Sequence, residues 1–180
     1  MKISYCTNCH NRLWQLEQTI EHNLSFTKVG EIELYVLAYN DETIEPYLME
    51  HYSNHIADGR LVVKTHDDIK PYSFGYVKNL SHLLGQGRVL FNLDSDNYID
   101  GVDKALITLQ DGEILVTSMS YLKDGRGGRI GVTRNTFNQL NGYLDNQRRP
   151  DDDDFVFRAM QMGKRLKHAE CTKIPISNSL

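Results

Sequence analysis

Residues 1–97 alternate between short apolar runs and segments with apolar residues at helical spacing, and this alternation restricts the fold more than any other feature. A short strand-like run begins with Ile3 and Tyr5, and apolar runs of strand length fall at residues 34–38, 61–63 and 89–93. The helical patterns fall between them, at residues 13–24, 44–52 and 77–84. This order predicts an α/β fold, a three-layer sandwich whose mostly parallel central sheet is joined by right-handed crossovers.

Residues 101–180 show a different rhythm, with a strand expected at 114–118, a glycine-rich loop at 125–131 and a last helix around 155–160. No linker, repeat or low-complexity tract separates the two halves. The length of 180 residues also suits one domain. We therefore predict a single domain over residues 1–180, in which the second half completes a site that the first half opens.

Two expectations concern side chains within the helical patterns. Apolar residues at helical spacing predict one buried stripe on the third helix, formed by Val77, Leu80, Leu83 and Leu84. The histidines of the second and third helical patterns are polar enough to face water, so we expect them to be solvated surface residues: His51, His55 and His82.

Composition and charge argue against several classes of function. A formal net charge of −4 disfavours binding to nucleic acid, which usually requires a basic surface. No apolar run approaches the ~20 residues that span a bilayer, and the N-terminus lacks a signal-peptide pattern, so we expect no membrane span and a cytoplasmic location. The 3 cysteines are an odd number, and we interpret Cys6 and Cys9 as buried thiols rather than a redox or zinc pair.

Polar clusters follow three of the expected strands, at residues 8–12, 40–42 and 94–97. Ligands of open α/β sheets bind outside the carboxyl ends of the strands. We therefore expect one crevice to receive side chains from all three clusters.

The segment Asp94-Ser95-Asp96 carries the clearest chemistry of the first half. Carboxylates at the end of a strand suit Mg²⁺ or Mn²⁺, which takes one or two protein carboxylates and completes its shell with phosphate oxygens and water. That preference indicates a nucleotide diphosphate as the ligand. The alternative is an ordinary turn, since Asp, Ser and Asn all initiate turns.

Four consecutive aspartates, residues 151–154, open the last expected helix. One interpretation is structural, because acidic side chains at a helix N-terminus meet unbonded amides and the positive end of the helix dipole. The other is catalytic, because crowded carboxylates raise one another's pKa and favour a general base. The glycine-rich loop at 125–131 matches neither the dinucleotide fingerprint nor the P-loop, which disfavours NAD and ATP folds.

Taken together, these motifs resemble the nucleotide-sugar-dependent glycosyltransferases of the GT-A fold, especially the inverting family 2 and β-1,4-galactosyltransferase type. The first half carries four matching segments: Cys9-His10-Asn11-Arg12 after the first strand, Tyr39-Asn40-Asp41 where the second strand ends and the family often places an acidic residue on the uridine, the basic–Asn pair Lys78-Asn79, and the DxD-like Asp94-Ser95-Asp96. The second half carries three more: Gly127-Gly128, Asn141-Gly142-Tyr143, and the run of aspartates followed by Arg158. The resemblance covers residues 3–168.

The resemblance implies a nucleotide-binding half at residues 1–100 and an acceptor-binding, catalytic half at residues 101–180. It implies Asp152 as the general base, and Asp96 with His168 as ligands of Mn²⁺ or Mg²⁺. His168 follows the acidic motif earlier than the family's histidine does. The other implied site residues contact the donor or the acceptor: Arg12, Asn40, Asp41, Lys78, Asn79, Asp94, Arg129, Asp151 and Asp153.

The reaction that the resemblance implies moves a hexose, with galactose as one candidate, from a UDP-sugar to a saccharide hydroxyl with inversion at the anomeric carbon. One alternative is a non-catalytic nucleotide- or sugar-binding module, whose carboxylates only hold a cation. Another is a sugar-phosphate nucleotidyltransferase, but such enzymes usually need a glycine-rich loop after the first strand, and residues 6–12 contain no glycine. Turnover of a UDP-sugar distinguishes an enzyme from a binding module.

Overall fold

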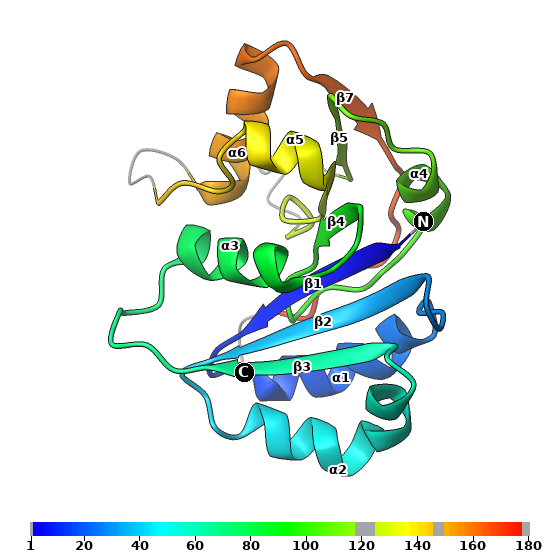
Figure 1. Ribbon diagram of the computed structural model, residues 1–180, viewed down its shortest axis with the longest axis vertical. Coiled ribbons are helices and arrows are strands. Elements are labelled where there is room, and N and C mark those ends of the chain that lie inside the picture. Colours follow the sequence, from blue (N-terminus) through cyan, green and yellow to red (C-terminus); the bar gives the residue numbers. More distant parts are fainter. Residues whose placement is uncertain (1, 118–124, 146–149, 178–180) are drawn as a thin grey trace.

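The structure of the chain is a computed structural model that describes residues 2–117, 125–145 and 150–177. Strands and helices alternate through the first half in the predicted order: β1 (Ile3–Cys9), α1 (Leu13–Leu24), β2 (Ile32–Tyr39), α2 (Ile44–Ala57), β3 (Leu61–His66), α3 (Phe74–Leu84) and β4 (Val89–Asn92) (Figure 1). The second half supplies the remaining elements: α4 (Asp103–Ile107), β5 (Glu113–Val116), β6 (Ile130–Thr133), α5 (Arg134–Gln139), α6 (Asp151–Gln161) and β7 (Arg165–His168).

The strands form one sheet in the order β3-β2-β1-β4-β6-β5-β7. β1 pairs in parallel with both β2 and β4, and β2 pairs in parallel with β3. β6 runs antiparallel to its neighbours β4 and β5, whereas β7 is parallel to β5. The predicted α/β class with a mostly parallel central sheet is confirmed.

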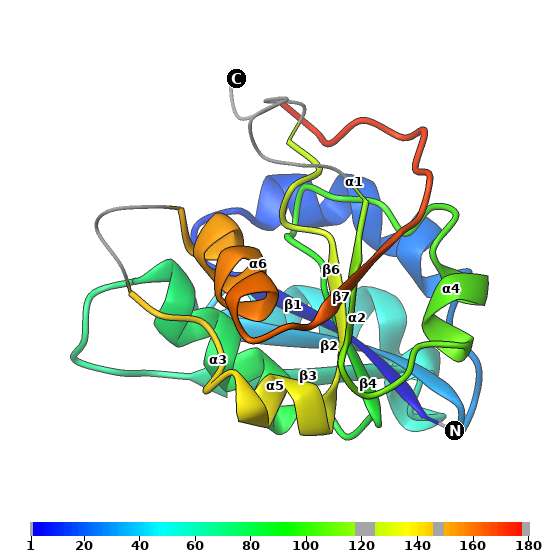
Figure 2. The ribbon, with the colours of Figure 1, turned by 90° about the horizontal axis from the view of Figure 1, so that it is seen from above.

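Helices cover both faces of the sheet. α1 and α2 lie on one face of the β1–β3 strands and α3 lies on the other, while α5 and α6 lie on the same side as α3 (Figures 1 and 2). β2 shows the consequence for the sequence: Leu34 and Val36 pack into the core cluster shared with α1 and α2, and Tyr35 and Leu37 pack with Val77 of α3. A strand covered on both faces buries every side chain, which explains its continuous apolar run.

The predicted stripe of α3 is wrong at its C-terminal end, where Leu83 and Leu84 are 61% and 43% exposed. The buried face of α3 instead includes Lys78 and His82. The ring of His82 stacks on Phe137 with centroids 5.0 Å apart, and its Nδ1 lies 2.7 Å from the carbonyl oxygen of Lys78. The expectation of a solvated His82 is therefore wrong, because a stacking partner and a backbone acceptor allow the neutral imidazole to be buried.

Two sequence-based expectations concern cysteines and membrane spans. Cys6 and Cys9 are buried free thiols, as predicted, and burial raises the pKa of both. No helix within the described ranges has both the length and the apolar character needed to cross a membrane. The predicted strand at residues 114–118 corresponds to β5, and residue 118 lies outside the described residues.

Candidate active site

The segment after β4 forms a turn at the carboxyl edge of the sheet, and α1 holds that turn in place. The backbone amide of Asn97 donates to the carbonyl oxygen of Asp94 at 2.9 Å and closes the turn. From α1, Thr19 Oγ1 donates to the carbonyl of Ser95 at 2.8 Å, and Asn23 Nδ2 donates to the carbonyl of Asn97 at 2.9 Å. The turn interpretation of this segment is therefore correct as a description of its backbone.

A cavity of about 250 Å³ lies at this edge of the sheet. Three predicted site residues line it together, namely Arg12 after β1 and Asp94 with Asp96 after β4. The other lining residues are Asn8, His10, Tyr72, Phe74, Ser95 and Gly125. The rings of His10 and Tyr72 stack with centroids 5.1 Å apart, and Tyr72 Oη donates to Asn8 Oδ1 at 2.7 Å. This stacked pair was not predicted, because no recognisable sequence motif relates His10 to Tyr72.

Asp96 has the environment of a cation ligand. Its Oδ1 accepts from Asn97 Nδ2 at 2.6 Å, and burial followed by the negative charge of Asp94 raises the pKa of its carboxyl. A divalent cation would relieve both effects, and the carboxylate oxygens of Asp94 and Asp96 suit Mn²⁺ or Mg²⁺. The residues of this cavity therefore fit the implied ion.

No group of three or more His, Cys, Asp and Glu side chains within the described ranges is placed to bind a metal. An ion held by Asp96 would therefore complete its shell with phosphate oxygens and water, which Mg²⁺ and Mn²⁺ commonly do. His168 lies at the end of β7 with an exposed side chain. Its role as a metal ligand stays a prediction.

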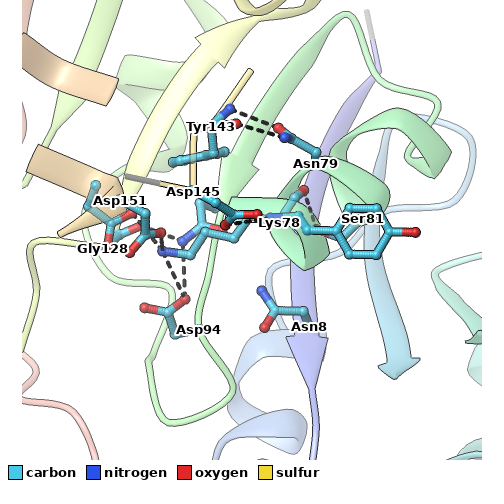
Figure 3. Close-up of polar contacts among 12 residues, drawn as sticks. Asn8, Lys78, Asn79, Ser81, Asp94, Gly128, Tyr143, Asp145 and Asp151 are labelled. Atoms are coloured by element: carbon cyan, nitrogen blue, oxygen red, sulfur yellow. Dashed lines mark hydrogen bonds and ion pairs between the residues drawn. The ribbon is translucent and has the colours of Figure 1, made fainter. Parts of the chain in front are cut away.

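Lys78 of α3 joins carboxylates from both halves of the chain. Its Nζ lies 2.7 Å from Asp152 Oδ1, 2.6 Å from Asp151 Oδ2 and 3.8 Å from Asp94 Oδ1 (Figure 3). The Lys78 side chain is only 2% exposed. Burial alone would lower the pKa of this ammonium, but the charges of Asp152, Asp94 and Asp151 outweigh burial and raise it well above its ordinary value. Lys78 is therefore charged and surrounded by carboxylates.

Asp152, in the first turn of α6, has the protonation behaviour expected of a general base. Burial raises the pKa of its carboxyl to about 7, as do the charges of Asp94 and Asp151, while Lys78 acts in the opposite direction. The backbone at Gly128 packs against the same carboxylates, since a Cβ there would collide with Asp94 Oδ2 and lie 3.2 Å from Asp152 Oδ2. The close approach of the loop to these carboxylates explains why position 128 is a glycine.

The four aspartates of α6 have different partners. Asp151 and Asp152 bind Lys78, whereas Asp154 Oδ2 accepts from Arg158 Nε at 2.7 Å. Arg158 also donates to the carbonyls of Leu140 and Gly142, at 2.5 Å and 2.6 Å, and so fixes α6 to the preceding turn. Pro150 is the N-cap of α6 and makes no side-chain cap hydrogen bond, so none of the aspartates is the N-cap, and the dipole and catalytic interpretations of the acidic run stay predictions. Asp153 is half-buried in the same turn, and an acceptor contact from it stays a prediction.

Asn40 and Asp41 hold the chain where β2 ends. Asn40 adopts a left-handed conformation with φ 46°. Its side-chain Nδ2 donates to the carbonyl oxygen of Asp68 at 3.0 Å, and its Oδ1 accepts from the backbone amide of Asp68 at 2.7 Å. Asp41 accepts from the backbone amides of Asn11 at 2.8 Å and Thr43 at 3.1 Å. Neither residue lines the cavity, so the expectation that all three polar clusters share one crevice is wrong for residues 40–42, whose side chains bind neighbouring loops instead. The predicted contact of Asn40 and Asp41 with a nucleotide stays a prediction.

Asn79 and Arg129 are also engaged by the chain itself. Asn79 exchanges two hydrogen bonds of 2.8 Å with the backbone of Tyr143 (Figure 3). The fully buried Arg129 donates to Asn97 Oδ1 at 2.6 Å and to the carbonyl of Lys173 at 2.9 Å. Neither lines the cavity, and their predicted substrate contacts stay predictions.

The segment after β7 returns across the β4 turn toward α1, a path that was not predicted (Figure 2). The amide of Ile176 donates to the carbonyl of Asp96 at 2.9 Å, and Asp100 accepts from the amide of Lys173 at 2.7 Å. The last described residues therefore support the turn that carries Asp94 and Asp96.

Comparison with known proteins gives a fold but no sequence family. No protein-family model matches the sequence, and no curated protein matches it. Among solved structures, the chain is similar to the mannosyltransferase PcManGT from Pyrobaculum calidifontis in complex with GDP-Man and Mn²⁺, with a TM-score of 0.76, 12% identity, and coverage of 99% of this chain and 58% of that one. The chain therefore has a GT-A glycosyltransferase fold.

Two further solved structures share this arrangement. One is S. aureus TarS 1-349, with a TM-score of 0.71, 14% identity, and coverage of 97% of this chain and 59% of that chain. The other is a Drosophila β1,4-galactosyltransferase 7 in complex with manganese, UDP-Gal and xylobiose, with a TM-score of 0.61, 16% identity, and coverage of 97% and 67%. The chain thus spans less than two thirds of the length of the first two structures.

Proposed function

We propose that the chain is a metal-dependent inverting glycosyltransferase that moves a hexose from a UDP-sugar to a saccharide hydroxyl. The observation that carries this proposal is the meeting of Asp94, from the predicted donor side, and Asp152, from the acidic motif, at the ammonium of Lys78. Two of the structures similar to this chain support it, because they are complexes with a nucleotide sugar and manganese. Galactose is one candidate for the hexose.

In the proposed reaction, Asp152 takes the proton of the acceptor hydroxyl while the acceptor oxygen forms a bond to the anomeric carbon. The bond from that carbon to the diphosphate breaks, and UDP leaves with the bonding electrons. Asp152 lies in the opening turn of α6, next to the loop at Gly128 and to Asp94. Proton removal by a positioned base contributes roughly 10²- to 10⁴-fold to a rate.

The donor side of the site consists of Arg12, Asp94 and Asp96 around the cavity. Arg12 supplies a fixed positive charge for the diphosphate, because a guanidinium is always protonated. Mn²⁺ or Mg²⁺ held by Asp96 would act as a Lewis acid that neutralises charge on the leaving diphosphate. Asp151 and Asp153, which flank Asp152 in α6, are proposed to orient the acceptor.

The Asp152→Asn variant tests the assignment of the base, because it keeps the shape of the side chain and removes its basicity. We expect transfer from a UDP-sugar to fall by about 10²- to 10⁴-fold, while UDP binding measured by calorimetry persists. Asp67→Asn, on an exposed aspartate, is the matched control and should retain full transfer.

Two other results of this experiment would change the proposal. Equal transfer by Asp152→Asn and the unsubstituted chain would remove Asp152 from the role of base. Binding of UDP without turnover of any UDP-sugar by the unsubstituted chain would favour the non-catalytic binding module.

A further inference from the structure

The buried ammonium of Lys78 has a role that substrate contact does not explain. The side chain is 2% exposed and does not line the cavity that contains Arg12 and Asp96. Its three partners come from separate parts of the chain: Asp94 follows β4, and Asp151 with Asp152 opens α6. Lys78 is therefore the physical connection between the donor-side carboxylate and the proposed base.

The position of Lys78 is fixed by contacts on both sides of it in α3. The adjacent Asn79 binds the backbone of Tyr143 with two hydrogen bonds, and the amide of Tyr76 donates to Asp145 Oδ1 at 3.3 Å. The Lys78 Nζ also lies 5.3 Å from the centroid of the Tyr143 ring. An ammonium held this firmly imposes its own position on the carboxylates that it binds.

The two oxygens of Asp152 have different surroundings. Oδ1 accepts the hydrogen bond from Lys78, and Oδ2 lies on the side of the Gly128 loop. We propose that Lys78 is a positioning residue, which fixes the orientation of Asp152 so that Oδ2 receives the acceptor proton and which ties that orientation to Asp94. Lys78 keeps all of its own protons during transfer. This inference rests on the proposed function, because it takes Asp152 as the base.

Lys78→Met tests the inference, since it removes the ammonium and keeps an unbranched side chain of similar length. Lys28→Met is the matched control. Lys28 is exposed, and its Nζ lies 2.7 Å from Oε1 of Glu31, which is also exposed. The readout is the χ1 angle of Asp152, measured by NMR from the three-bond couplings of its Cγ to the backbone nitrogen and carbonyl carbon. A variant that only loses stability lowers the melting temperature without changing these couplings.

We expect couplings of a single staggered χ1 rotamer in the unsubstituted chain, in Lys28→Met and in Lys78→Arg, which retains the positive charge. In Lys78→Met we expect the couplings to move to the averaged values of a side chain that exchanges between rotamers. A folded Lys78→Met chain with the same single rotamer of Asp152 would overturn the inference.

A second measurement uses the unsubstituted chain and holds even where Lys78→Met does not fold. The Nζ protons of Lys78 should exchange slowly with water and show a hydrogen-bond coupling to the Asp152 carboxyl carbon. Exchange as fast as that of Lys28, with no such coupling, would contradict the inference. Neither measurement needs UDP or an acceptor, so both remain informative where the chain turns over no UDP-sugar.

Kinetic measurements can reject the positioning role of Lys78 while the proposed transferase function stands. In an active chain, Lys78→Met should lower kcat by about 10²-fold, the cost of a misplaced catalytic group. Unchanged kcat together with unchanged χ1 would reject the role of Lys78 and leave the transferase proposal standing.

Discussion

Asp152 is the residue whose environment makes the most direct prediction about pH. Burial raises the pKa of its carboxyl to about 7, so a large share of the molecules carry a protonated Asp152 at neutral pH. A protonated carboxyl cannot accept the proton of the acceptor hydroxyl. Log kcat/KM should therefore rise with a slope of about one below pH 7 and level off above it, since kcat/KM reports the pKa of the unliganded enzyme.

A pH series of UDP-sugar turnover between pH 5 and pH 9 tests this prediction. The acid limb should be absent from any residual turnover of Asp152→Asn. A profile that is flat across pH 7 in the unsubstituted chain would show that no group titrating there acts as the base.

His82 makes a separate prediction about stability. Burial lowers the pKa of its imidazole to about 4 in the folded chain, below the unfolded value of 6.5. Between these values His82 binds its proton more readily in the unfolded chain, so its contribution to the free energy of unfolding falls by about 3 kcal/mol as the pH falls from 6.5 toward 4. Asp152, whose folded pKa is raised, contributes with the opposite sign in this range. Urea denaturation of the unsubstituted chain and of His82→Phe at several pH values isolates the His82 contribution as the difference between the two.

The matched variants His82→Phe and His51→Phe assign the effect. His82→Phe replaces the buried ring with one that does not titrate, so its stability relative to the unsubstituted chain should increase as the pH falls from 6.5 toward 4. His51 is exposed, and His51→Phe should retain the pH dependence of the unsubstituted chain. Equal pH dependence in all three chains would show that His82 is not the group responsible.

Individual side chains were the part of the site least accessible to sequence reasoning. The motif positions of Arg12, Asp94 and Asp96 brought these residues to one cavity, because all three directly follow strands whose carboxyl ends meet. Lys78 could not be assigned in this way. Its partners lie 16 or more positions away along the chain, and a sequence does not show which of several aspartates a lysine in a helix will meet.

At the scale of elements, the loop before β6 packs against carboxylates of both acidic motifs, at Asp94 and at Asp152. A Cβ at Gly128 would collide with Asp94 and come within 3.2 Å of Asp152. We expect Gly128→Ala to destabilise the fold by about 1–3 kcal/mol through overpacking, and to lower UDP-sugar turnover by at least tenfold because both carboxylates must shift. Chemical denaturation and initial rates measure the two effects.

Gly163→Ala is the control for Gly128→Ala. Gly163 has φ +70° and open space around it, so alanine there costs about 1 kcal/mol of backbone strain without touching the site. Its turnover should equal that of the unsubstituted chain at temperatures where both are folded. Equal turnover by the two alanine variants would contradict a role for the Gly128 approach.

The elements of the first half were predictable because each is strongly patterned. β2 is buried on both faces, and its unbroken apolar run signals this directly. β6 was not predicted, since it has only 4 residues and begins at Ile130, inside the segment expected to be a glycine-rich loop. Its antiparallel place between β4 and β5 depends on contacts between distant segments, which local patterns do not encode.

At the scale of the whole molecule, the α/β alternation predicted the layers and the edge of the sheet that carries the cavity. The path of residues 169–177 across the β4 turn was not predictable, because that segment has no helix or strand pattern. It binds through backbone groups, such as the Ile176 amide to the Asp96 carbonyl, and these are the same for any sequence. The donor-side turn is therefore built from both ends of the described chain.

At this scale we propose that the chain binds UDP through a divalent cation at Asp96. The most direct test is the melting temperature of the chain with UDP, with and without Mn²⁺, and of Asp96→Ala under the same conditions. A ligand at about 100 times its Kd stabilises the native state by about 2.7 kcal/mol, which for a chain of this size raises Tm by about 5–10 °C. We predict such a rise with UDP and Mn²⁺ together, a smaller one with GDP or ADP, and loss of the Mn²⁺ dependence in Asp96→Ala. No shift with any nucleotide in the folded protein, with or without Mn²⁺, would contradict the account.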